Sequence, residues 1–161
     1  MPEELVKPHP VVRTTARSLR EARVDDYGMV RTRSRDCVDA RIGKASIKRV
    51  SRILNALIRA LEVRGISLVE GKKDGEGLRL RVEGEVLEFR IEETSRCERY
   101  QPTAAEKTLL DNDPYYRRRL PKDKFIPSGK LSLKLGGRWG SRGLRTTWND
   151  GKRQKIEHCL N

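Results

Sequence analysis

The chain has 161 residues, of which 37% are charged and 35% hydrophobic, so we expect one domain with a small core and a densely ionic surface. No apolar run approaches the roughly 18 residues of a membrane span, and the first residues lack the apolar segment of a secretory signal. We therefore expect a cytoplasmic protein with no membrane partner. Three widely spaced cysteines without a C-x-x-C pair argue against a disulfide framework and a zinc site, and no cofactor is expected.

The net charge of +13 is distributed unevenly along the chain. Residues 1–64 contribute +7, residues 65–116 contribute −4 and residues 117–161 contribute +10. Basic ends around an acidic middle are typical of a surface that faces phosphate groups, because lysine and arginine bind nucleic acid by neutralising its backbone. A solubilising surface without a partner is the alternative.

The N-terminal part predicts a basic helix followed by a cluster of arginines. Apolar residues recur at helical spacing over residues 11–22, and arginines are interleaved with them. The next arginines alternate with polar residues in a pattern that a folded core cannot use; they are Arg31, Arg33 and Arg35. We expect residues 1–36 to form a basic, partly flexible segment and residues 37–161 to form a single α+β domain, with a fragment of a longer chain as an open alternative.

Residues 46–65 give the strongest helical pattern. An apolar stripe runs from Ile47 to Leu61, Ser46 is a candidate N-cap, and Gly65 stands where a left-handed residue ends a helix. The remaining face is basic and supplies three candidate nucleic-acid contacts, namely Lys48, Arg49 and Arg52.

After this helix, apolar and charged residues alternate. The alternation predicts an antiparallel meander over residues 66–91, after a short strand at residues 37–42. Residues 94–128 appear as an irregular segment with one helical turn, and alternation returns in two later stretches, residues 131–135 and 144–148. We expect an α+β fold in which the long helix packs on one face of an antiparallel sheet of about five strands, with a C-terminal helix that begins near Asp150.

Four stretches stand out together. They are residues 46–65 (SIKRVSRILNALIRALEVRG), 82–93 (VEGEVLEFRIEE), 127–135 (PSGKLSLKL) and 148–160 (WNDGKRQKIEHCL). They resemble the C-terminal region of an uncharacterised family of bacterial proteins that is often found on mobile elements, and whose members frequently carry an N-terminal segment similar to a helix-turn-helix. The resemblance implies a bacterial, DNA-associated role without a catalytic residue set. This chain lacks the helix-turn-helix-like segment.

Two segments of the C-terminal half combine aromatic and basic side chains. The first is suited to base stacking together with phosphate pairing, and consists of Tyr115, Tyr116, Arg117, Arg118 and Arg119. The second is a glycine-rich loop between two predicted strands, and it carries Arg138, Trp139 and Arg142. A solvated loop and a mobile hairpin are the respective alternatives. We expect a non-catalytic nucleic-acid-binding domain, with DNA favoured over RNA.

Enzymatic activity has weaker support. The sequence Gly43-Lys44-Ala45-Ser46 lacks the upstream glycine of a phosphate-binding loop, and the histidines are confined to the two terminal segments. A metal-dependent nuclease is the best enzymatic alternative, with Asp74 and Glu88 as Mg²⁺ ligands, although Arg90 stands where such sites place a lysine. A further alternative is a protein-interaction module that forms a homodimer or joins a larger complex.

Overall fold

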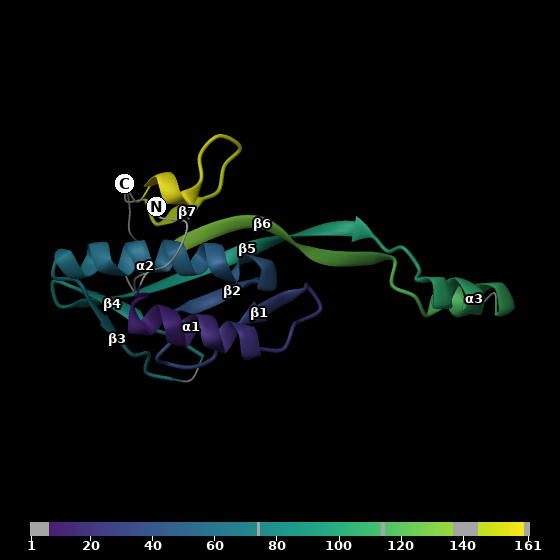
Figure 1. The fold of residues 1–161 in the computed structure, drawn as a ribbon, viewed down its shortest axis with the longest axis horizontal. Helices are drawn as coiled ribbons and strands as arrows, with labels where there is room; N and C mark the ends of the chain where they lie inside the picture. The colour runs from purple at the N-terminus through teal and green to yellow at the C-terminus, as the bar shows by residue number, and fades with distance from the viewer. Residues whose placement is uncertain (1–6, 74, 114, 137–144, 160–161) are drawn as a thin grey trace.

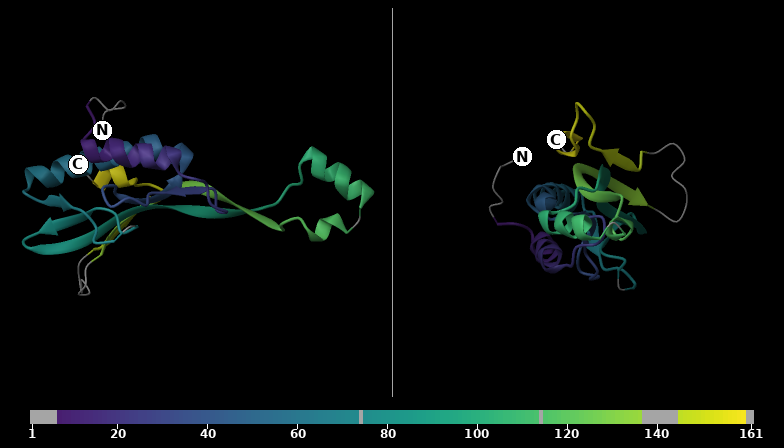
Figure 2. Two further views of the ribbon diagram at one scale, coloured as in Figure 1. Left: turned by 90° about the horizontal axis from the view of Figure 1, so that it is seen from below. Right: turned by 90° about the vertical axis from the view of Figure 1, so that its right-hand side faces the viewer.

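The computed structural model describes residues 7–73, 75–113, 115–136 and 145–159. Within these residues, two helices cover one face of a mixed sheet of seven strands, and two long strands extend from this body to a small helical tip (Figures 1 and 2). The α+β class is confirmed. The expectation of a purely antiparallel sheet of about five strands is wrong.

Helix α1 (Pro10–Glu21) forms where the apolar spacing predicts a helix. Proline occupies the first turn, where its missing N–H leaves no helical hydrogen bond unmade. His9 caps the helix through Nδ1, and its own N–H donates to the Asn55 side chain at 2.9 Å, which ties α1 to the next helix. The buried apolar side chains of α1 join the common core; they are Val12, Ala16 and Leu19.

Helix α2 (Ile47–Val63) is the predicted long amphipathic helix. It follows a 3₁₀ turn, η1 (Lys44–Ser46), and Ser46 takes the N-cap position without a side-chain capping hydrogen bond. Its end is as predicted: Gly65 has a φ of 74°, and its N–H donates to the carbonyl of Glu62 at 2.9 Å. Ile66 adds the second bond of this motif, which satisfies carbonyls left open at the helix end.

The sheet is built around one long central strand. In spatial order its strands are β1 (Met29–Arg31), β2 (Asp39–Gly43), β5 (Glu85–Arg99), β4 (Arg79–Val82) and β3 (Ser67–Val69), with β6 (Asp123–Gly136) on β5 and β7 (Thr147–Asn149) on β6. Strand β2 runs parallel to β5, and the other strand pairings among the described residues are antiparallel. The parallel pairing makes the sheet mixed.

Alternate residues of the sheet face the two helices and form the core. The inward side chains of the central strands are buried in one core with those of α1 and α2. They include Ile42, Leu80, Phe89, Ile91 and Leu133. Burying each such side chain contributes roughly 1.5–3 kcal/mol, so this face supplies the main driving force for folding. The opposite face carries charged side chains and is open.

Beyond the body, β5 and β6 continue as an arm, which we define as residues 95–127. The register shifts between Glu93 and Ser95, and from that point β5 pairs only with β6 among the described residues. The arm ends in α3 (Ala104–Asn112) and the 3₁₀ turn η2 (Tyr116–Arg118) (Figure 1). The expectation of an irregular segment at residues 94–128 is therefore wrong for the strands, whereas the helical turn expected within it is confirmed by α3. A two-stranded ribbon lacks a buried face, so it lacks the apolar alternation by which a strand is predicted.

Contacts at its base fix the arm to the body. Glu93 is only 5% exposed, and its carboxylate accepts hydrogen bonds from the N–H groups of Gly43 at 2.9 Å and Gly129 at 2.6 Å. A Cβ atom on Gly43 would lie 2.6 Å from Pro127, so this close approach requires glycine. The ring of Tyr27 packs against Phe125 with 5.0 Å between centroids.

The C-terminal segment packs back on the body. The predicted C-terminal α-helix is instead a 3₁₀ turn, η3 (Ile156–Cys159), in which Ile156 is buried. This turn is held by Asp150, whose carboxylate accepts the N–H of Ile156 at 3.0 Å. The predicted strand at residues 144–148 overlaps β7. No helix in the described part of the chain is long and apolar enough to cross a bilayer.

Candidate nucleic-acid interface

On the open face of the sheet, three cations already have carboxylate partners, whereas the exposed Arg81 of β4 has no carboxylate oxygen within 4.0 Å among the described residues. Arg79 lies 3.3 Å from Glu88, and Glu92 bridges two cations, Arg90 at 3.3 Å and Lys134 at 2.5 Å. These neighbours lower the pKa of Glu92 against the opposing effect of its partial burial. We call Arg79, Arg90 and Lys134 the sheet-face cations. Their charge is offset by the acidic middle of the chain.

The outward face of α1 is different. Three exposed arginines occupy positions i, i+4 and i+7 of the helix and so project from one side; they are Arg13, Arg17 and Arg20. Among the described residues, none of them has a carboxylate oxygen within 4.0 Å. This face therefore presents cations without a direct ion pair, although the pKa of Asp36 is lowered by a hydrogen bond from Ser34 and, to a smaller extent, by the nearby charge of Arg17.

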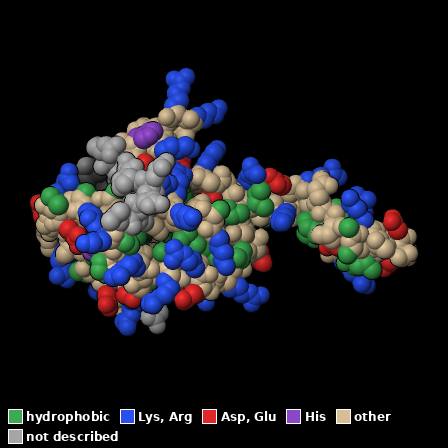
Figure 3. All heavy atoms as spheres, in the orientation of Figure 1, with side chains coloured by type: hydrophobic (Ala, Val, Ile, Leu, Met, Phe, Trp, Pro, Cys, Tyr) green, Lys and Arg blue, Asp and Glu red, His purple; other side chains and the backbone are tan. Residues whose placement is uncertain are grey.

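Two adjoining hollows continue this basic face at the C-terminal end of α1. They have volumes of about 870 and 420 Å³ and share Ala22, Arg31 and Arg33 in their linings. Arg23 lines the larger hollow, whose Asp25 is engaged with Arg41 at 2.6 Å. We call the combined region the α1 surface, made of Arg13, Arg17, Arg20, Arg23, Arg31 and Arg33. Figure 3 shows lysine and arginine side chains spread over the side of the body on which α1 and α2 lie.

The predicted contacts of the N-terminal half divide into exposed cations and half-buried ones. Arg31 and Arg33 are exposed on the α1 surface, although Arg31 also lies 3.4 Å from Asp39, and Arg35 is exposed in the same loop. Lys48 is exposed on the first turn of α2. Arg52 is half-buried, and its Nε has no hydrogen-bond partner among the described residues.

Arg49 is used by the fold itself. Its Nη1 donates to Asp150 at 2.7 Å and its Nε donates to Glu157 at 2.6 Å, which pins the C-terminal segment to α2. The Asp150 side chain is 0% exposed. Burial alone would raise the pKa of Asp150, but hydrogen bonds from Arg49 and from the N–H of Leu131 bring it to about 2. We therefore assign Arg49 to stability.

The predicted Tyr-Tyr-Arg segment lies at the tip of the arm. Tyr115 is 70% exposed, Tyr116 is half-buried, and Arg117 and Arg119 are exposed around η2. The Arg118 side chain, and all of Arg138, Trp139 and Arg142, lie outside what the structure describes. The arm thus carries one predicted aromatic and basic segment away from the body.

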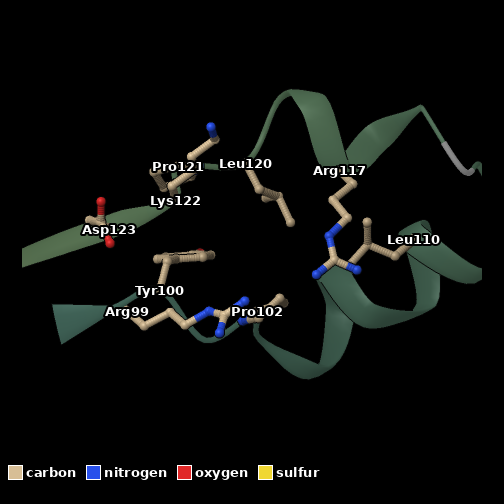
Figure 4. A pocket seen from close by; sticks show the side chains of 9 residues that line it. All are labelled: Arg99, Tyr100, Pro102, Leu110, Arg117, Leu120, Pro121, Lys122 and Asp123. Carbon is tan, nitrogen blue, oxygen red and sulfur yellow. The ribbon is translucent and has the colours of Figure 1, made fainter.

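A pocket of about 540 Å³ opens at this tip (Figure 4). Both strands of the arm and both tip elements line it, with Arg99, Tyr100, Pro102, Leu110, Arg117, Leu120, Pro121, Lys122 and Asp123. In Figure 4 the Tyr100 ring, the Leu120 side chain and the Arg117 guanidinium surround the opening, while Lys122 extends away from it. We call this hollow the tip pocket.

Hydrogen bonds hold the Tyr100 ring in place. Its N–H donates to the carbonyl of Lys122 at 3.0 Å, and its hydroxyl donates to the Glu106 carboxylate at 2.8 and 2.9 Å. Glu106 also completes a capping box with Thr103 at the start of α3. The hydroxyl bond raises the pKa of Tyr100, while the N–H of Thr103 and then Tyr100 lower the pKa of Glu106. One carboxylate therefore fixes both the helix start and the ring.

The nuclease alternative gains no geometric support from the described residues. They contain no cluster of His, Cys, Asp and Glu side chains that would hold a metal ion. Glu88 and Arg90 lie on the open sheet face, where their ion-pair partners are Arg79 and Glu92 respectively. Asp74 lies outside the described residues.

Two groups of surface residues were not among the predicted contacts. The arginines on the outward face of α1 had a usable signal, because their spacing alone puts them on one side of a helix. Arg99, Tyr100 and Lys122 had none, because the tip pocket joins segments about 20 residues apart in the sequence through the pairing of β5 with β6.

Comparisons of the chain with protein-family models, with curated proteins and with solved structures give no significant match. The bacterial, DNA-associated role implied by the resemblance stays a prediction. The chemistry of the two surfaces described above is the basis for a function.

Proposed function

We propose that this protein is a non-catalytic nucleic-acid-binding domain, with DNA favoured over RNA, that contacts phosphate groups through the α1 surface and the arm. The observation that carries the proposal is the contrast in pairing. The sheet-face cations have carboxylate partners in direct contact, whereas Arg13, Arg17 and Arg20 have no carboxylate oxygen within 4.0 Å among the described residues.

The contrast matters because binding to a polyanion depends on the cations that remain uncompensated. Each phosphate that a lysine or arginine neutralises releases condensed counterions, and this release gives salt-dependent affinity. A cation already held by a carboxylate must first lose that partner. The helical arginines of the α1 surface, Arg13, Arg17 and Arg20, have no such contact to lose, and their row of guanidiniums is suited to phosphate oxygens.

The arm supports the same proposal by its shape and charge. Residues 95–127 carry eight Lys/Arg and five Asp/Glu, so the arm is net positive. A two-stranded ribbon is one of the elements that the major groove of DNA admits. The five residues of each strand within the arm span about 16 Å at roughly 3.3 Å per residue.

A salt titration tests the proposal. Fluorescence anisotropy with short labelled DNA and RNA, single- and double-stranded, would be recorded at a series of salt concentrations. We expect log K to fall linearly with log[salt] with a slope of about −3 or steeper, since each phosphate contact contributes about −0.9 on a duplex. Affinity that is absent at low salt, or that does not respond to salt, contradicts the proposal.

The same protein and labelled DNA also test the two alternative functions, a metal-dependent nuclease and a protein-interaction module. A metal-dependent nuclease cleaves the labelled DNA when Mg²⁺ is added, and Glu88→Gln abolishes the cleavage. An interaction module gives a discrete homodimer or a complex that survives nuclease treatment in light-scattering measurements. The proposal predicts intact DNA and a protein that is monomeric when free of nucleic acid.

A further inference from the structure

The tip of the arm lacks a core of its own. Helix α3 has no buried residue, and Leu109 is 47% exposed. A nine-residue helix is marginal in water without packing, and so is an isolated pair of strands. An occupant of the pocket would supply the packing that the tip lacks, and would thereby explain why this projecting segment is folded.

The walls of the tip pocket combine one aromatic ring with aliphatic side chains. Tyr100 provides the ring, and Pro102, Leu110 and Leu120 provide apolar surface beside it. Its volume of about 540 Å³ falls in the range of roughly 300–1,000 Å³ that is usual for small-molecule sites. A flat heterocyclic base suits a wall of this kind, because every base has a face that stacks on an aromatic ring.

The rim of the pocket is positive. Arg99, Arg117 and Lys122 are exposed, and among the described residues none of them has a carboxylate oxygen within 4.0 Å. Asp123 is the one carboxylate among the lining residues. The pocket thus offers a stacking surface with cations beside it, which matches a base together with its phosphate.

We infer that the tip pocket holds one unpaired nucleotide of the bound nucleic acid, with its base against Tyr100 and its phosphate near Arg99 and Arg117. This inference rests on the proposed function. A second copy of the chain is a poorer occupant, since the partner would also carry a net charge of +13. The bonds that already hold Tyr100 reduce the ordering cost of stacking on it.

The test uses three duplex probes of equal length with the full chain. The first probe is fully paired, and the second carries one unpaired nucleotide. The third carries an abasic site at the position of that unpaired nucleotide. We expect wild-type protein to bind the second probe about tenfold more tightly than the first, as a single base stack allows. The third probe is expected to bind like the first, because it lacks the base.

Variants connect this preference to the pocket. Tyr100→Leu removes the ring and should abolish the tenfold preference, whereas Tyr100→Phe keeps the ring and should retain it. Tyr27→Leu is the matched control, because Tyr27 is an exposed aromatic residue outside both the pocket lining and the predicted contacts. A 2-aminopurine base at the unpaired position should change its fluorescence with wild type and Tyr100→Phe, and not with Tyr100→Leu.

Each result has one meaning. Equal salt-dependent binding of all three probes overturns the inference and leaves the proposed function standing. Failure to bind any probe at low salt removes the proposed function itself. A preference that persists with the base-free probe, which needs only wild-type protein, also overturns the inference, because the bend or flexibility of the probe would then be its cause.

Discussion

The open face of the sheet and the outward face of α1 carry similar cations but in different electrostatic settings. On the sheet, Glu88 and Glu92 lie within 3.3 Å of the cations that flank them. On α1, Arg13 and Arg17 project without a carboxylate within 4.0 Å among the described residues. The net charge of the chain does not distinguish these faces, but the pairing of each cation does.

This difference has a physical origin in how the two elements are built. Strand pairing brings carboxylates of the acidic middle beside basic side chains: Glu88 lies directly opposite Arg79, and Glu92 reaches Lys134 diagonally across the β5–β6 pair. Such cross-strand pairs are favourable. An amphipathic helix with one buried stripe has no neighbour on its outer side. Its outward cations therefore stay available for a partner outside the chain.

The largest expected effect is a loss of stability when Arg49 of α2, which is paired with a carboxylate as the sheet-face cations are, is replaced. Arg49→Met leaves the buried Asp150 carboxylate without its main partner, so the free energy of unfolding should fall by about 3–5 kcal/mol in urea titrations. Lys48→Met, at the exposed neighbouring position, should stay within about 0.5 kcal/mol of wild type. Equal stabilities of the two variants would show that Arg49 is not structural.

The same carboxylate predicts a loss of stability in acid. The pKa of Asp150 is lowered to about 2 in the folded state, below its unfolded value of about 4. Its contribution, about 2 kcal/mol, is therefore fully present above pH 4 and lost as the pH falls through about 2. Unfolding titrations between pH 5 and 2 should decline less steeply in Asp150→Asn than in wild type, and parallel curves would contradict this assignment.

A smaller effect is expected from the exposed arginines of the arm. Arg117→Gln combined with Arg119→Gln should lower nucleic-acid affinity about tenfold at low salt and flatten the slope of log K against log[salt] by about 2. The control removes two paired cations instead, through Arg90→Gln with Lys134→Gln. If both pairs of changes flatten the slope alike, the arm has no special part in binding.

The smallest effect on nucleic-acid affinity is expected when a carboxylate that pairs with the sheet-face cations is removed. Glu92→Gln leaves Arg90 and Lys134 without their shared carboxylate, so affinity should rise by a factor of about three or less. Glu70→Gln changes the net charge equally at an exposed residue and serves as the control. Anisotropy titrations that rank Glu70→Gln equal to or above Glu92→Gln would argue that total charge, and not pairing, governs binding.

Local features of the fold were predictable from the sequence. The apolar spacing of α1 and α2, and the left-handed Gly65 at the end of α2, depend on residues within one helix, and the structure agrees with them. The basic face of α1 is visible in the same spacing. These features need no knowledge of distant partners.

Features that join distant segments were not predictable in this way. The parallel pairing of β2 with β5 joins Ala40 to Ile91, and alternation identifies a strand without identifying its partner. Arg49 had the pattern of an exposed helical cation, because its partners Asp150 and Glu157 are about 100 residues away in sequence. The tip pocket depends in the same way on the pairing of two strands.

The most direct test of the central claim compares two triple variants that lose the same charge. Arg13→Gln, Arg17→Gln and Arg20→Gln alter the α1 surface, and changing Arg79, Arg90 and Lys134 to Gln alters the sheet-face cations. The measured quantity is the slope of log K against log[salt] for one DNA probe. We predict a slope flatter by about 2–3 for the α1 variant and within about 0.5 of wild type for the sheet variant. Equal flattening in both would contradict the claim that unpaired cations define the interface.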